Sequence, residues 1–104
     1  MAASRIEALK AMLTQDPADG TLHYMLGNEY FKTQMDAEAV AAFGRYLLLV
    51  DDEGAVYRML ARSLERLGRL EEARQAYHDG LAAATRHGHQ PMIDEYNQAL
   101  RDLG

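Results

Sequence analysis

Residues 22–32 read LHYMLGNEYFK, and this stretch decides the fold. Leu26 and Tyr30 are four residues apart, which places them on one face of an α-helix, while Asn28 and Lys32 fall on the opposite face. Apolar positions recur at spacings of three and four residues throughout the chain, and no segment alternates apolar and polar residues as a strand does. The pattern predicts an all-α protein.

The same stretch recurs at a fixed offset of 34 residues. Large residues align with large ones and small residues with small ones. The aligned pairs are His23/Tyr57, Leu26/Leu60, Gly27/Ala61, Tyr30/Leu64, Ala39/Ala73, Phe43/Tyr77 and Leu47/Leu81. We expect Gly27 and Ala61 to let two helices approach closely where Ala39 and Ala73 face them. An unrelated helical bundle would not match at so many positions of one offset, so the chain contains an internal repeat.

Six helices are expected, joined by short connections that make successive helices antiparallel neighbours. Asp36 is the expected N-cap of the third helix, Gly88 the expected left-handed stop of the fifth, and Pro91 suits the first turn of the sixth. The expected ranges are 4–14, 21–33, 37–50, 55–67, 70–86 and 91–102.

The amino-acid composition disfavours several classes of function. With 104 residues, 48% apolar and 26% charged, the chain fits one globular domain. The absence of cysteine excludes disulfides and thiolate chemistry, and a net charge of −5 disfavours nucleic acid as a partner. The first thirteen residues carry Arg5, Glu7 and Lys10, unlike a signal peptide, and the longest apolar run, residues 46–50, is too short to span a bilayer. We expect a cytoplasmic protein without membrane partners.

These residues resemble the tetratricopeptide repeat (TPR), a 34-residue helix–turn–helix unit. The first unit reads His23-x2-Leu26-Gly27-x2-Tyr30 and then Ala39-x3-Phe43; the second is looser. The sequence departs from the family pattern at His23, Tyr46, Asp51 and Thr85. The resemblance implies antiparallel helix pairs stacked as a short right-handed superhelix. One domain over 1–104 would then hold a half-repeat (4–17), two repeats (20–53 and 54–87) and a capping helix (90–103).

The last helix fits only in a shifted register. Continuing the 34-residue register would bury Asp94, Glu95 and Gln98 without partners. A shift of two residues buries Ile93, Tyr96 and Leu100 instead. Met92, Ala99 and Leu103 then face the preceding repeat, and the other face, with Asp94, Asn97, Gln98, Arg101 and Asp102, is polar and exposed.

Resemblance implies that a partner lies along the first helix of each pair, in a concave groove. The expected partner-binding residues are Tyr24, Asn28, Phe31, Lys32, Arg58, Arg62 and Arg66. Aromatic and guanidinium side chains anchor interfaces, so we expect a protein or an acidic, carboxylate-bearing peptide as the partner. The alternative is a solvated arginine face neutralised by Glu65 and Glu29. Only Asn28 fits the carboxylate clamp with which some relatives hold chaperone tails, so that mode is not expected.

Two other classes of function are a self-association module and an enzyme. Leu48 is expected to pack near the start of the next repeat; if it is exposed, a structural self-association (homodimer) module becomes a serious alternative. The expected state is a monomer or weak homodimer. An enzyme is not expected, and neither is a cofactor or a metal. His87 and His89 lack an i,i+4 partner, Glu71-Glu72 suits a helix N-terminus, and no phosphate-binding glycine loop occurs.

Overall fold

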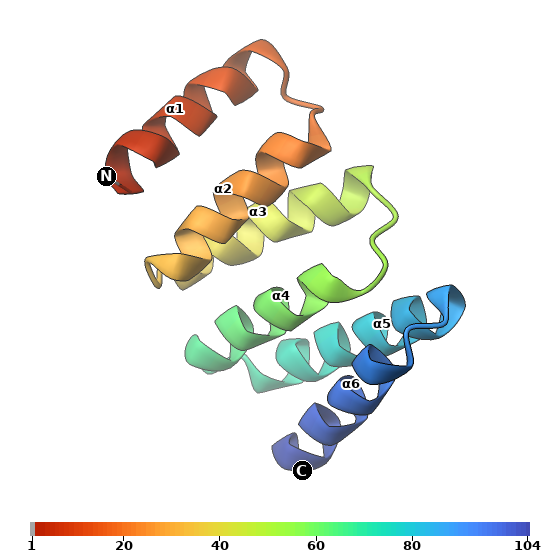
Figure 1. Cartoon of the computed structure of the whole chain (residues 1–104). Coiled ribbons are helices and arrows are strands. Elements are labelled where there is room, and N and C mark those ends of the chain that lie inside the picture. Colours follow the sequence, from red (N-terminus) through yellow and green to blue (C-terminus); the bar gives the residue numbers. More distant parts are fainter. Residues whose placement is uncertain (1) are drawn as a thin grey trace. The chain divides into compact units, whose positions relative to one another are not determined.

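The computed structural model describes residues 2–104, with side chains from Ser4 onward; Met1, the first residue of the expected domain, lies outside the described residues. The described part contains six helices and no strand (Figure 1). They are α1 (Ala2–Gln15), α2 (Gly20–Lys32), α3 (Asp36–Leu49), α4 (Ala55–Arg66), α5 (Leu70–His87) and α6 (Gln90–Leu103). The predicted all-α fold of helix–turn–helix repeats is confirmed.

The chain divides into two compact units, Met1–Asp51 and Asp52–Gly104. In the first unit α2 packs against both α1 and α3. Its core contains Ile6 and Leu9 of α1, Leu22, Leu26 and Tyr30 of α2, and Ala39, Ala42 and Phe43 of α3. Gly27 does let α3 approach closely, as expected, but its nearest neighbour is the ring of Phe43. A Cβ on Gly27 would lie 2.7 Å from that ring. The ring of Phe43 therefore sets how closely α2 and α3 approach.

Local signals explain how the first unit's helices begin and end. The Asp19 carboxylate accepts a hydrogen bond from the Leu22 amide (3.3 Å) and caps α2. Gln34 adopts a left-handed conformation (φ 58°), and the Met35 amide donates to the Tyr30 carbonyl, which ends α2. The expectation that Asp36 is the N-cap of α3 is wrong by one residue. Met35 holds that position without a side-chain cap, and Asp36 opens the helix, where its charge suits the helix dipole.

In the second unit α5 packs against both α4 and α6. Asp52 accepts hydrogen bonds from the amides of Gly54 (2.8 Å) and Val56 (3.1 Å) and so starts α4. Gly88 ends α5 in the left-handed region (φ 70°), and Pro91 lies in the first turn of α6, as predicted.

The shifted register of α6 is also confirmed. Tyr96 is fully buried against Tyr77, with ring centroids 6.0 Å apart, and its hydroxyl donates to the Gly54 carbonyl. Ile93 and Leu100 are half-buried beside it, as are Met92, Ala99 and Leu103. On the polar face only Asn97 differs from expectation, since it is half-buried. None of the helices in residues 2–104 combines the length and apolar content needed to cross a membrane.

Candidate partner-binding surfaces

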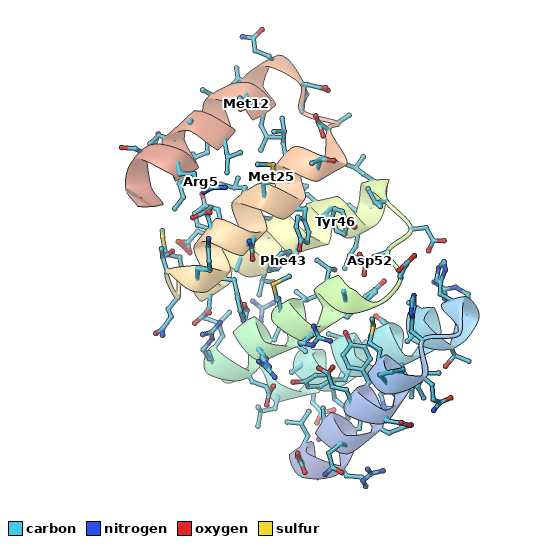
Figure 2. All side chains as sticks on the ribbon, in the orientation of Figure 1. Arg5, Met12, Met25, Phe43, Tyr46 and Asp52 are labelled. Atoms are coloured by element: carbon cyan, nitrogen blue, oxygen red, sulfur yellow. The ribbon has the colours of Figure 1, made fainter. Side chains whose placement is uncertain are left out.

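Tyr24 does not project freely from α2. Its ring packs on Tyr46 (centroids 5.5 Å apart) and Phe43 (6.5 Å), which lie one turn apart on α3 (Figure 2). The side chain remains 36% exposed. Tyr46 stands where the family has a small residue, so α3 offers a ring that covers one side of Tyr24. Tyr24 is therefore exposed, as expected, although part of its ring is covered by α3, and its role as an anchor stays a prediction.

Lys32 forms an ion pair with a residue of its own helix. Its Nζ lies 3.1 Å from Oε1 of Glu29, and the same oxygen lies 3.1 Å from Nε of Arg5 on α1. Glu29 is only 5% exposed, so its charge needs these two cations. Within the first unit, the carboxylate of Glu29 is thus paired with Arg5 and Lys32. Asn28 and Phe31 are half-buried on the same helix.

Arg58 is held by α6. Its Nη2 donates to Oε1 of Glu95 at 2.7 Å, and its Nε donates to Oε2, a bidentate pair. The hydrogen bonds raise the pKa of Arg58 and lower the pKa of Glu95 below its ordinary range. Arg58 therefore joins α4 to α6, and a ligand would have to displace Glu95 to bind it.

A hollow of about 260 Å³ lies beside this pair, within the second unit. Arg62 of α4 is exposed at its edge, and Gln98 and Asp102 face it from α6. Its lining residues are Arg58, Arg62, Tyr77, Glu95, Gln98, Ala99 and Asp102. The hollow is thus lined by two guanidinium groups, of which Arg58 is paired with Glu95, and by an amide and two carboxylates.

Tyr77 closes the inner side of the hollow. Its hydroxyl donates to Oε2 of Glu65 at 2.6 Å, and burial with the adjacent carboxylate raises its pKa. Glu65 is thus engaged by Tyr77, while Arg66 is exposed and lies outside the lining of the hollow.

The predicted residues fall into two sets. Tyr24, Asn28, Phe31 and Lys32 belong to the first unit, and the three arginines belong to the second. A single groove along both sets stays a prediction. Glu95 and Tyr77 were not predicted as site residues, because the packing of α5 and α6 determines what lies beside them. The polar face of α6, which includes Gln98 and Asp102, was the sequence feature that could have indicated this surface.

Two further hollows lie in the first unit, along the outer side of α3. One, of about 250 Å³, is lined by Leu13, His23, Leu26, Tyr30, Glu38, Ala41, Ala42 and Arg45. The other, of about 230 Å³, is lined by Pro17, Ala18, His23, Arg45, Leu48 and Leu49. His23 is half-buried and its Nε2 lies 2.8 Å from the Pro17 carbonyl, so it occupies the expected aromatic position. Leu48 is 83% exposed, so the expectation that it is packed is wrong.

Comparison with known proteins identifies the family. No family model matches the chain. A curated relative, the "TPR repeat-containing protein PA0015" of Pseudomonas aeruginosa, is 32% identical over 99 residues, covering 94% of this chain and 93% of the relative. The solution structure of protein BPP2914 from Bordetella parapertussis superposes with a TM-score of 0.77 at 30% identity, covering 94% of this chain and 85% of that one. The chain therefore belongs to the tetratricopeptide repeat family, a family of protein–protein interaction modules.

Proposed function

We propose that this protein is a scaffold or adaptor that binds a partner protein or peptide through the exposed faces of α2 and α4. The hollow beside Arg62 carries the proposal, because it offers an exposed guanidinium next to the Gln98 amide. A carboxylate entering there would receive bidentate hydrogen bonds from Arg62 and a further bond from the amide.

The other charges of the hollow define which acidic ligand fits. Arg58 is paired with Glu95, whereas Arg62, which interacts with the Tyr77 hydroxyl and lies near Glu95, is the exposed cation of the hollow. Glu95 and Asp102 would repel a run of acidic residues. The preferred ligand is thus a peptide in which one carboxylate stands beside a basic or amide side chain that can meet those two carboxylates.

The first unit would add apolar contact. The accessible edge of Tyr24 and the half-buried Phe31 and Asn28 lie on one face of α2. An aromatic edge with a neighbouring amide suits an apolar anchor residue whose backbone needs one hydrogen bond. Lys32 contributes less than expected, since it is bound to Glu29.

The test starts from partners that co-purify with the full chain, followed by calorimetric titration of the peptide that each supplies. Arg62→Glu should weaken binding at least tenfold, because it removes a charge-assisted hydrogen bond of ~1.5–3 kcal/mol. Lys10→Glu, an equal charge reversal on α1, is the matched control and should leave the affinity unchanged. Equal affinities of a folded Arg62→Glu variant and the wild type would refute the assignment.

Arg58 is unsuitable for this test. Reversing its charge would place a second carboxylate in contact with that of Glu95 and loosen α6, so lost binding would report on folding. A more informative second variant is Arg66→Glu, because Arg66 lies one turn beyond Arg62 on the same face of α4.

A further inference from the structure

We propose that the outer face of α3 binds a second copy of this chain, as an antiparallel pair of α3 helices around a two-fold axis. The face consists of Glu38, Ala41, Arg45 and Leu48, which recur at spacings of three and four residues and therefore form one stripe. All four are exposed. The stripe borders both hollows of the first unit, which are completed by residues of α1, α2 and the α1–α2 connection.

Charge complementarity identifies a second copy as the occupant. Glu38 and Arg45 are seven residues apart on the stripe, about 10.5 Å along the helix axis. If two α3 helices run antiparallel and cross midway between them, Glu38 of each copy faces Arg45 of the other. The midpoint falls next to Ala41, whose small, exposed side chain lets the two backbones approach. An isologous interface requires such a self-complementary patch, with the acid and the base equidistant from the axis.

The apolar residues follow the same symmetry. In the pairing that joins residue 38 to residue 45, Leu48 faces residue 35 of the other copy, which is the exposed Met35. Leu48 then also lies next to the hollow lined by Leu13, Leu26 and Tyr30. Each copy thus supplies a projecting leucine and an apolar recess to receive one.

The expected dimer is weak. A stable interface buries ~800 Å² on each partner, which is about an eighth of the 5991 Å² of accessible surface here. The interface must therefore include the two hollows and the start of α3 in addition to Leu48. The net charge of −5 on each copy also opposes association. Dimerisation should accordingly appear only towards high protein concentration.

Charge exchange tests the pairing directly, by sedimentation velocity of the full chain over a concentration series. Glu38→Arg and Arg45→Glu should each abolish the dimer, because each places like charges opposite one another. The double variant Glu38→Arg/Arg45→Glu should restore it. An equimolar mixture of the two single variants should form a heterodimer, since one copy then carries two arginines and the other two glutamates.

A second pair of variants tests the apolar contact. Leu48→Glu should raise the dimer dissociation constant at least tenfold, whereas Leu70→Glu, at an exposed leucine of the second unit, should leave it unchanged. Circular dichroism checks that each variant is folded. A wild-type chain that stays monomeric at millimolar concentration would overturn the proposal. So would a dimer that is insensitive to Leu48→Glu, or single charge variants that neither dissociate nor pair with each other.

Discussion

Two glycines of the first unit differ in what an added methyl group would meet. On Gly27 a Cβ would lie 2.7 Å from two carbons of the buried Phe43 ring, whereas on Gly44 of α3 it would meet nothing within 4 Å. The aromatic ring cannot move away, because Phe43 is fully buried and Tyr24 packs against it.

Gly27→Ala should therefore destabilise the protein by ~1–3 kcal/mol through overpacking, despite its better helix propensity. Gly44→Ala should instead stabilise it by ~0.5–1 kcal/mol, because only the entropy of the unfolded chain and the helix preference change. Urea unfolding of the two variants measures both effects. A destabilised Gly44→Ala, or a stabilised Gly27→Ala, would contradict the packing described for α2 and α3.

Tyr96 should make the unfolding free energy depend on alkaline pH. Burial raises its pKa from the ordinary value of 10.0 to about 12, so the folded protein holds the phenolic proton more tightly than the unfolded chain does. This contribution is complete below pH 10 and is lost as the pH rises through about 12. Tyr96→Phe should remove that part of the alkaline decline, which chemical denaturation at several pH values can measure.

The same substitution also has an effect at neutral pH. It removes the hydrogen bond from the Tyr96 hydroxyl, so the Gly54 carbonyl keeps only the bond from the Tyr57 amide (3.3 Å), at a cost of ~0.5–1.5 kcal/mol. If Tyr96→Phe were neutral in stability, the hydroxyl would not be what joins α6 to the start of α4.

Between helices, the ion pair of Arg58 with Glu95 is the contact to measure. It joins α4 to α6 with bidentate geometry, but both side chains are about one-third exposed, so solvent screens it. A double-mutant cycle with Arg58→Gln and Glu95→Gln should give a coupling of ~1 kcal/mol at neutral pH.

The coupling should disappear in acid. Arg58 lowers the pKa of Glu95, so the stabilisation is present above the ordinary glutamate value of 4.5 and is lost as the pH falls through the lower folded value. Repeating the cycle over a series of falling pH values, until the coupling no longer changes, tests this sign. A coupling that survives full protonation of the carboxylate would show that packing, not charge, links the two helices.

For the protein as a whole, the two proposed surfaces should act independently. The Arg62 hollow lies in the second unit and the α3 stripe in the first, so they share no residue. Leu48→Glu should weaken the dimer at least tenfold yet retain wild-type peptide affinity, and Arg62→Glu should do the reverse. Calorimetry and sedimentation on the same two variants check this; a variant that loses both properties would indicate a folding defect or one shared site.

Much of this architecture follows from local chemistry and was predictable. The period of 34 residues, the left-handed Gly88, Pro91 and the apolar spacing around Tyr96 each constrain the chain near their own position, so helix ends and the register of α6 could be read from them. The same holds for the all-α fold and the family.

Only the tertiary structure decided which side chains meet. Arg58 with Glu95, Arg5 with Glu29 and Tyr24 with Tyr46 join residues on different helices, and no spacing rule relates such positions. Packing contacts and ion pairs engage three residues of the predicted site, Tyr24, Lys32 and Arg58, and leave Arg62 exposed beside a hollow. The sequence by itself determined which residues form helices and which helical faces are apolar, because those depend on near neighbours. Packing determined which charges remain available to a partner, because that depends on what the rest of the unit places opposite them.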